Sequence, residues 1–239
     1  MTHPLDNPLW AALSGPQAHL AVRLGRAARF PPDVSPFAAV AGDGGWADLA
    51  ALVGEDGTAV VPDAPEVAPP GWELVGAIPG VQMDGSRLAV RHDPEAVRLG
   101  PADVPEMLDL VARTQPGPFG PRTITLGTYL GIRRGGALVA MAGERMRPAG
   151  WGEISAVCTD PAHRGQGLAG RLVRAVGAVV RERGDVPFLH AAATNAAGIR
   201  LYKQLGFTRR REILFAALRA TEGGSPRSPR DGHAAVGVQ

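Results

Sequence analysis

From Glu153 to Ala169 the sequence reads Glu-Ile-Ser-Ala-Val-Cys-Thr-Asp-Pro-Ala-His-Arg-Gly-Gln-Gly-Leu-Ala, and this stretch decides the fold. β-Branched and small residues from 151 to 159 predict a short buried strand, which Asp160-Pro161 stops. From 166 to 183 apolar residues recur at helical spacing, with arginines on the other faces. The glycines therefore lie at the start of a helix.

A glycine-rich helix start predicts a site for an anion. The first backbone N–H groups of a helix have no partner inside it, and the helix dipole is positive there. Gly165 and Gly167 let the main chain approach an anion closely. The Lys-Ser or Lys-Thr pair of a P-loop does not follow these glycines. A pyrophosphate fits the pattern.

The segment resembles the acyl-CoA loop of the GNAT superfamily of N-acyltransferases, whose pattern Arg/Gln-x-x-Gly-x-Gly/Ala is matched by Arg164, Gly167 and Ala169. A second segment, residues 195–207, supports the resemblance. It has an asparagine after an apolar strand at 186–193, a tyrosine seven residues on, and then Leu-Gly-Phe. The resemblance implies the GNAT fold, an α/β protein with a mixed sheet, and acetyl-CoA as the acyl donor.

The resemblance covers about residues 95–219, and the pattern there predicts strand, helix, hairpin, strand, helix, strand, helix and strand pair. We expect a strand at 96–99 and then a helix to Ala112, which Asp103 and Glu106 would cap as a pair. The expected hairpin joins strands at 129–133 and 137–146 through Arg134-Gly135-Gly136.

The N-terminal part of the chain predicts a weaker α/β pattern. Its expected elements are strands at 20–24, 37–41, 58–61 and 72–78 and a helix at 46–53. We interpret residues 1–92 as a degenerate GNAT-like N-terminal lobe, 93–220 as the catalytic GNAT domain and 221–239 as a disordered tail, poor in apolar residues. The glycine N-acyltransferase-like branch shares such a two-lobed plan and also matches at Gly152-Glu153. A second CoA loop at 42–45 is disfavoured, because that segment lacks the arginine and carries an acid.

Composition narrows the class of protein. With 239 residues, 45% of them hydrophobic, the chain can bury a core, and a formal charge of +2 is too small to argue for nucleic acid. The basic run 209–211 more simply begins a strand. The single cysteine excludes an internal disulfide, and no stretch has the length of a membrane span or the form of a signal peptide. We expect a cytoplasmic protein without membrane or nucleic-acid partners.

Transfer of an acyl group to an amine needs a base, because the ammonium must first lose a proton. Strand alternation predicts that Glu153, Ser155 and Val157 share one face, toward the acyl group. In the glycine N-acyltransferase-like branch the glutamate at this place is the general base, so Glu153 is our candidate, with Glu144 as the reserve. The alternative is a solvated or salt-bridged strand glutamate.

The resemblance supplies the other roles. A backbone N–H at Val157 or Cys158 would bind the oxyanion. Tyr202 would protonate the leaving thiolate, although it could instead be a core aromatic, and Asn195 is either a helix cap or a cofactor ligand. The expected cofactor-binding residues are Val157, Cys158, Thr159, Arg164, Gly165, Gln166, Gly167, Leu168, Ala169, Gly170 and Asn195.

Other chemistries fit less well. Cys158 lies in a strand without a histidine fixed near it by sequence, so it reads as a buried core residue and not as a nucleophile. His163 and His190 lack metal-ligand spacing, and we predict no metal. The Pro- and Gly-rich segment 114–122 predicts an exposed loop beside the acceptor.

Three hypotheses follow for the function. The first is an enzyme that acetylates a small-molecule amine or amino acid, with a homodimer as a possible assembly. The second is acetylation of a protein N-terminus or lysine. The third is an acyl-CoA-binding protein without catalysis, since a fold does not fix a function.

Overall fold

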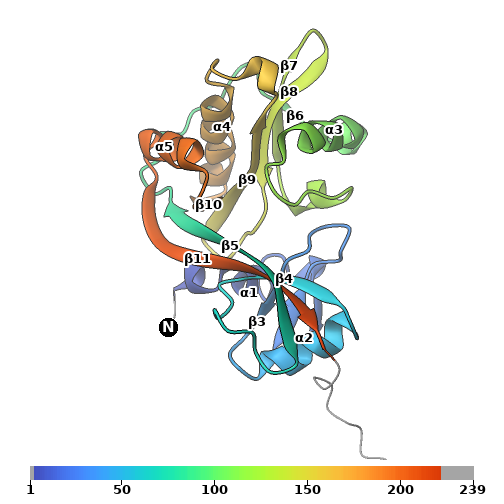
Figure 1. Cartoon of the computed structure of the whole chain (residues 1–239). Coiled ribbons are helices and arrows are strands. Elements are labelled where there is room, and N and C mark those ends of the chain that lie inside the picture. Colours follow the sequence, from blue (N-terminus) through green and yellow to red (C-terminus); the bar gives the residue numbers. More distant parts are fainter. Residues whose placement is uncertain (1–2, 222–239) are drawn as a thin grey trace, which may run out of the picture.

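A computed structural model describes residues 3–221 of the chain. It has two lobes, which two long antiparallel strands connect (Figure 1). These strands are β5 (Trp72–Asp84) and β11 (Thr208–Ala220), and each runs from one lobe into the other. The expected disordered tail lies outside the described residues, apart from Thr221.

The main sheet has eight strands in the order β4-β11-β5-β10-β9-β8-β7-β6. Only the neighbours β9 and β10 run parallel, and every other pair is antiparallel. This mixed sheet confirms the expected fold class. The remaining strands are β4 (Thr58–Pro62), β6 (Val97–Arg98), β7 (Tyr129–Arg134), β8 (Ala137–Glu144), β9 (Trp151–Thr159) and β10 (Val186–Ala192).

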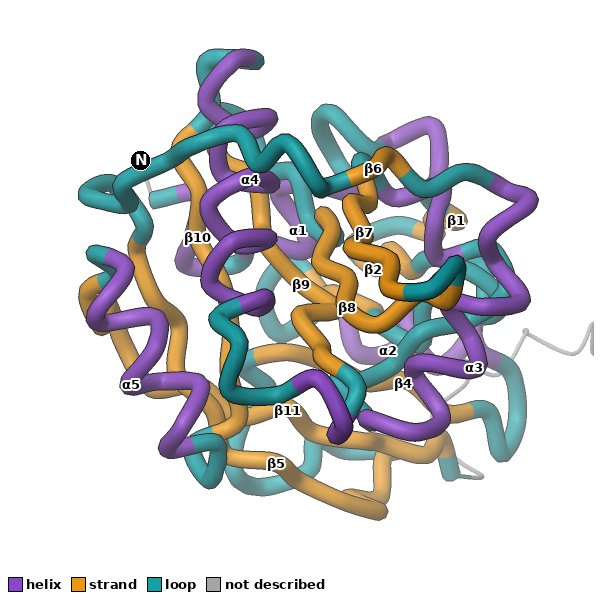
Figure 2. Tube along the Cα trace, turned by 90° about the horizontal axis from the view of Figure 1, so that it is seen from above, coloured by secondary structure: helices purple, strands orange, loops and turns teal. Residues whose placement is uncertain are grey.

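Helices cover both faces of the strands β7 to β9. On one face α4 (Leu168–Glu182) buries Leu172, Val173 and Val176 completely, and α5 (Ala196–Leu205) lies beside it. On the other face α3 (Val104–Thr114) buries Met107 and Leu110. Seen from above, α4 and α3 lie on either side of β8 (Figure 2). The amphipathic pattern of each helix thus faces the sheet.

The N-terminal lobe has a small sheet of β1 (Val22–Leu24), β2 (Ala27–Arg29) and β3 (Ala38–Val40), with α1 (Pro8–Leu13) and α2 (Gly45–Val53). The predicted strands at 20–24 and 37–41 contain β1 and β3, whereas the sequence pattern predicts neither α1 nor β2. Leu5, Leu9 and Phe37 from this lobe pack against Phe188 of β10. The lobe therefore covers one face of the main sheet near β10.

Strand β5 lies before the expected boundary at residue 92, yet it belongs to the same sheet as the strands after that boundary. Its second half, Gly80 to Asp84, lies between β10 and β11 and pairs with both. Residues from the first 92 thus complete the sheet of the second part. The expected boundary at residue 92 therefore divides the chain but does not divide the main sheet.

Two local predictions have different outcomes. The hairpin turn is confirmed, since Gly135 and Gly136 have φ values of +57° and +88°, as a tight turn between twisted strands requires. The expected capping pair is wrong, because the side chain of Asp103 does not cap α3. Asp103 and Glu106 instead both pair with Arg133 of β7, at 2.6 Å each.

The basic run at the start of β11 makes contacts within the chain. Arg209 pairs with Glu212, Arg210 with Asp6, and Arg211 with Asp63. Within residues 3–221 no helix combines the length and the apolar character that crossing a membrane requires.

Candidate active site

The parallel strands β9 and β10 separate partway along their length. Their pairing begins at Trp151–Val186 and ends at Glu153–Phe188, and no pair follows. Beyond this point Ser155, Ala156 and Val157 are partly exposed on β9. The sheet therefore opens between two neighbouring strands, and Glu153 stands where the opening begins.

A β-bulge shapes β9 inside this opening. Met141 pairs with Cys158 and Gly143 with Ser155, so two residues of β9 oppose one of β8. Ala156 has a φ of +51°, which is costly for a residue with a side chain, and such strain is concentrated at functional sites. The bulge is where the expected oxyanion donors, the N–H groups of Val157 and Cys158, lie.

The bulge also corrects one prediction. Simple alternation would place Val157 on the face of Glu153 and Ser155. Val157 instead packs with the cluster under α4, whereas Cys158 packs with Met107 and Tyr129 on the opposite face. One extra residue shifts the alternation by one position, so every side chain after it changes face.

The loop before α4 has the backbone that the glycines predict. Gly165 and Gly167 have φ values of +78° and +72°, and a Cβ on either would meet no other atom within 4 Å. Gly167 is the N-cap of α4 and no side chain caps the helix, so its first N–H groups are open. Leu168 is buried and fixes the helix, and the Arg164 side chain reaches the carbonyl of Thr159 at 3.3 Å.

The rest of the predicted loop is divided between surface and interior. Gln166 is exposed, Ala169 is half-buried, and Gly170 is buried against α5. Residues 165–170 also fit the letters Gly-x-Gly-x-x-Gly of dinucleotide-binding folds. That fold has a parallel sheet, whereas β9 here has an antiparallel neighbour in β8.

Helix α5 carries two of the predicted residues. Asn195 is its N-cap, and the side-chain oxygen accepts a hydrogen bond from the N–H of Gly198 at 2.9 Å. Tyr202 is 8% exposed and packs edge-on against Phe207. Burial raises the pKa of Tyr202 to about 12, and the neighbouring Cys158 thiol acts in the same direction. The phenol therefore stays protonated at neutral pH.

Glu153 is fully buried and saturated with donors. Arg145 donates to both carboxylate oxygens, at 2.9 Å from Nε and 2.6 Å from Nη2, and the N–H of Met146 adds a bond of 3.2 Å. Burial alone would raise the pKa of Glu153, but Arg145 and then His190 outweigh it and hold that pKa at about 2. A general base that titrates near neutrality has the opposite environment. The predicted base role stays a prediction.

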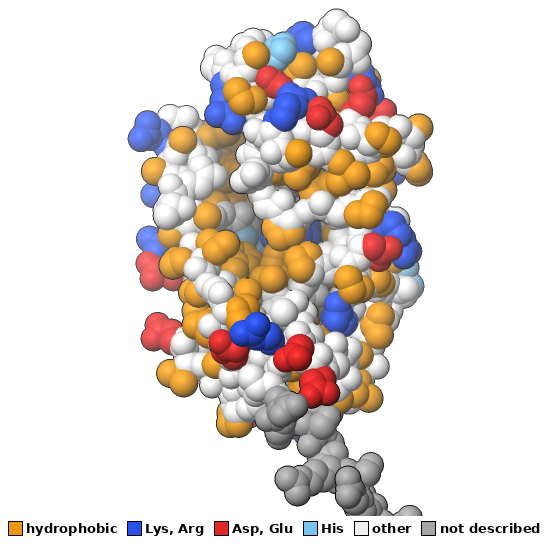
Figure 3. All heavy atoms as spheres, turned by 45° about the vertical axis from the view of Figure 1, so that its right-hand side comes forward, with side chains coloured by type: hydrophobic (Ala, Val, Ile, Leu, Met, Phe, Trp, Pro, Cys, Tyr) orange, Lys and Arg blue, Asp and Glu red, His pale blue; other side chains and the backbone are white. Residues whose placement is uncertain are grey.

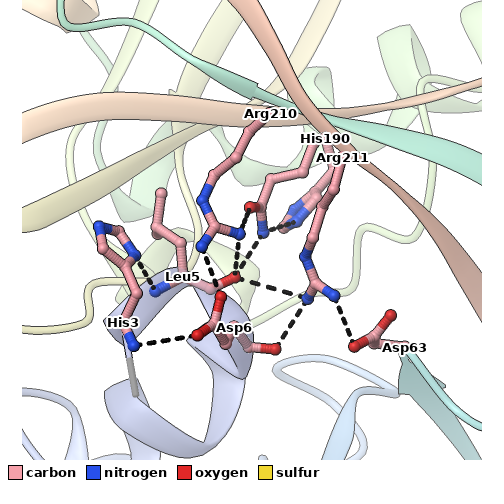
Figure 4. Close-up of polar contacts among 8 residues, drawn as sticks. His3, Leu5, Asp6, Asp63, His190, Arg210 and Arg211 are labelled. Atoms are coloured by element: carbon pink, nitrogen blue, oxygen red, sulfur yellow. Dashed lines mark hydrogen bonds and ion pairs between the residues drawn. The ribbon is translucent and has the colours of Figure 1, made fainter. Parts of the chain in front are cut away.

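His190 links Glu153 to the N-terminal segment, and Figure 4 shows His190 among the polar contacts around Leu5 and Arg210. Its Nδ1 lies 2.7 Å from Glu153 Oε1 and its Nε2 lies 3.0 Å from Gln82 Nε2. Gln82 Nε2 also donates to the carbonyl of Leu5, while its oxygen accepts from Arg210. This pattern fixes the amide orientation, so Gln82 donates to His190 and the imidazole hydrogen lies on Nδ1.

Two other candidates are also buried. The Glu144 carboxylate, the reserve base, is fully buried and accepts from Arg183 at 2.6 Å and from the N–H of Thr128 at 3.0 Å. Burial raises the pKa of the Cys158 thiol, so a reactive thiolate is disfavoured. Sequence reasoning missed Arg145 and His190 as partners of Glu153. Pairing the predicted strand at 137–146 with the strand that follows it could have indicated that Arg145 lies opposite Glu153.

Figure 3 shows one face of the molecule with a hollow near its middle, lined largely by hydrophobic and uncharged atoms. Two pockets of about 290 Å³ each are lined mainly by residues of the N-terminal part of the chain. One is lined by residues that include Asp43 and Trp46, the other by residues that include His3 and Trp10. Neither includes a residue of β9, β10 or α4.

Comparisons with known proteins agree with this architecture. A model of the FR47-like protein family matches residues 129–216. A crystal structure from Novosphingobium aromaticivorans DSM 12444, described as a GNAT-family acetyltransferase, has 44% sequence identity and a TM-score of 0.86, and the alignment covers 92% of this chain and 100% of that one. The chain therefore belongs to the GNAT family of N-acetyltransferases.

Two curated relatives are similar over shorter stretches. N-alpha-acetyltransferase RimI of Mycobacterium tuberculosis is 36% identical over 85 residues, which are 34% of this chain and 52% of the relative. Mycothiol acetyltransferase of Thermobispora bispora is 46% identical over 59 residues, 24% of this chain and 20% of the relative. The matches thus span about half of the first relative and a fifth of the second.

Proposed function

We propose that this protein moves an acetyl group from acetyl-CoA to a primary amine of a small molecule or amino acid. The observation that carries the proposal is the opening between β9 and β10, which leads to the uncapped N-terminus of α4. A thioester arm can lie in the opening while the pyrophosphate binds the open N–H groups near Gly167. The likeness to the glycine N-acyltransferase-like branch stays a prediction.

In this mechanism the amine nitrogen attacks the thioester carbonyl directly. The new N–C bond forms, the carbonyl electrons collect on oxygen, and a backbone N–H at the bulge, from Val157 or Cys158, stabilises that charge. The C–S bond then breaks and the electron pair leaves with the CoA sulfur. Donors fixed in a sheet need no reorganisation during the reaction, which makes the bulge suited to this role.

Tyr202 is the acid in the proposal. Its phenol is protonated at neutral pH because burial raises the pKa to about 12. The CoA thiol, with a pKa of about 8.5, is a stronger acid than this phenol, so the transfer is completed when the tyrosinate regains a proton, which the attacking nitrogen loses through water.

Glu153 has a positioning role in the proposal. Its carboxylate holds the guanidinium of Arg145 and the imidazole of His190 at the start of the opening. With a pKa of about 2 it is a weak base toward an ammonium, whose pKa is about 10. The ammonium proton then leaves to water in the opening, and Glu153 would take it only if the pair with Arg145 opened.

A CoA-release assay tests the function. The purified chain is mixed with acetyl-CoA and a panel of amines, amino acids and peptides, and free thiol is measured. Release that depends on a small amine supports the proposal. Release only with peptides would favour acetylation of protein N-termini, the activity in the name of the mycobacterial relative. Binding of acetyl-CoA without release of CoA for any acceptor would favour the hypothesis of an acyl-CoA-binding protein without catalysis.

A further inference from the structure

Arg145 keeps one part of its guanidinium free. Nε and Nη2 are bound to Glu153, and the Cζ atom lies over the ring of Phe37, 4.6 Å from its centroid. The third nitrogen, Nη1, has no hydrogen-bond partner among residues 3–221, and it is not one of the fully buried polar atoms that lack one. The 11% of this side chain that remains exposed therefore includes Nη1.

A second donor lies on the same face of the sheet. Tyr129 pairs with Gly143, which pairs with Ser155 on β9. Gly143 has no side chain, and the Tyr129 ring lies over it, so close that a Cβ there would stand 2.2 Å from the ring. The Tyr129 ring thus reaches across β8 toward the exposed part of β9.

The two donors are neighbours by register. Arg145 and Glu153 stand two residues beyond Gly143 and Ser155 on the paired strands, and residues two apart on a strand share a face. The charge of Arg145 acts on the Tyr129 phenol. The Tyr129 residue is only 1% exposed, and its hydroxyl, like Nη1, has no hydrogen-bond partner among residues 3–221. Burial raises the pKa of Tyr129, so this hydroxyl remains a donor.

We infer that Arg145 Nη1 and the Tyr129 hydroxyl bind a carboxylate on the acceptor, so that the enzyme selects amines that carry a carboxylate, as free amino acids do. This inference rests on the proposed function. Both groups donate hydrogen bonds, so a bare ammonium placed against them would be repelled. A guanidinium edge matches a carboxylate best among oxygen acceptors.

The aromatic surroundings fit such a ligand. Phe119, from the loop at 114–122 that the sequence places beside the acceptor, packs edge-on against Tyr129 at 5.6 Å. Phe37 backs the guanidinium from the N-terminal lobe. A site walled by aromatic rings strengthens the few polar contacts inside it, because it excludes water. The ion pair with Glu153 keeps the guanidinium in place for this task.

The test uses acceptors matched in side chain. Phenylalanine, its primary amide and phenethylamine differ only in the group beside the amine, and glycine, glycinamide and methylamine form a smaller set. We expect kcat/KM for the amino acid to exceed that for the amine at least about 10-fold, which is about 1.4 kcal/mol. Equal values across a set, or preference for the amide, would overturn the inference, and the second result would indicate a peptide acceptor.

Two variants and a control locate the effect. Arg145→Lys keeps a cation for Glu153 but lacks the third nitrogen, and Tyr129→Phe removes only the hydroxyl; both should reduce the preference for the carboxylate. Arg183→Lys changes the partner of the other buried glutamate, Glu144, and should leave the preference unchanged. A preference that survives in both Arg145→Lys and Tyr129→Phe would refute the assignment.

A binding measurement keeps this inference separate from the proposed function. Calorimetry with CoA present compares phenylalanine with phenethylamine without any turnover. Tighter binding of phenylalanine that Tyr129→Phe weakens supports the carboxylate site even if no acceptor releases CoA. Equal binding of the two ligands refutes the site, whatever the enzyme acetylates.

Discussion

His190 Nδ1 and Glu153 Oε1 lie 2.7 Å apart at the place where β9 and β10 separate. His190 stands two residues beyond Phe188, the last residue of β10 that pairs with β9. Its imidazole thus reaches back to a carboxylate that Arg145 already holds. At the start of the opening Glu153 is buried, and both of its carboxylate oxygens accept hydrogen bonds. This arrangement favours a positioning role.

The first prediction concerns the pH dependence of turnover in Glu153→Gln. If the carboxylate positions Arg145 and His190, turnover falls by a similar factor at every pH, because a group with a pKa of about 2 does not titrate in the assay range. The measurement is kcat/KM against pH for the native chain and the variant. Activity that recovers as pH rises and free amine accumulates would instead make Glu153 the general base.

The same residue predicts an acid-dependent loss of stability. The pKa of Glu153 is lowered from 4.5 to about 2, so its stabilisation is complete above the unfolded value and is lost as pH falls toward 2. A shift of this size corresponds to about 3 kcal/mol. Urea unfolding of the native chain and of Glu153→Gln should therefore show a stability difference that shrinks between about pH 5 and pH 2. A constant difference would contradict the ion pair.

The third prediction concerns the loop at α4. Gly167 and Gly184 have φ values of +72° and +87° with open space around them, and they stand at opposite ends of the helix. Alanine at either costs about 1 kcal/mol of stability. Only Gly167→Ala should weaken acetyl-CoA binding, by about 10-fold or more in calorimetry. Gly177 is an unsuitable control, because a Cβ there would stand 2.5 Å from Leu88.

The variant Tyr202→Phe distinguishes a role of the hydroxyl in catalysis from a role of the ring in packing. The ring and its contact with Phe207 remain, so stability and acetyl-CoA affinity should stay unchanged. Turnover should fall by about 10²-fold if the hydroxyl protonates the leaving thiolate. The loss should be smaller with a donor whose thiol is more acidic. Parental turnover with both donors would leave protonation of the thiolate to water.

Substitution of Asn195 tests whether its side chain only caps α5 or also binds the cofactor. Its side chain caps α5 through the N–H of Gly198, so Asn195→Ala should cost about 1 kcal/mol of stability and Asn195→Ser should restore most of it. With a cap role only, acetyl-CoA affinity is the same in both variants after correction for folding. A loss of affinity in the serine variant, which keeps the cap, would show that the amide contacts the cofactor.

The sequence by itself determined the elements around the loop. The predicted strand at 151–159 coincides with β9, and the predicted helix at 166–183 contains α4. Their signals are local: periodicity fixes the helix, Pro161 ends the strand, and the glycines allow positive φ values. Family motifs fall in the same segments, so the fold could be recognised from this part of the chain.

Only the tertiary structure decided what surrounds these residues. The bulge at Ala156 changed the face of Val157, and β5 entered the sheet from the N-terminal part of the chain. The sequence indicates Glu153 as a general base or as a solvated or salt-bridged glutamate, but it does not name the partners. These are His190, 37 residues away, and Arg145, just after the neighbouring strand β8. Ionisation depends on the charges and the solvent around a group, and packing between distant segments sets both. A local pattern cannot encode that environment.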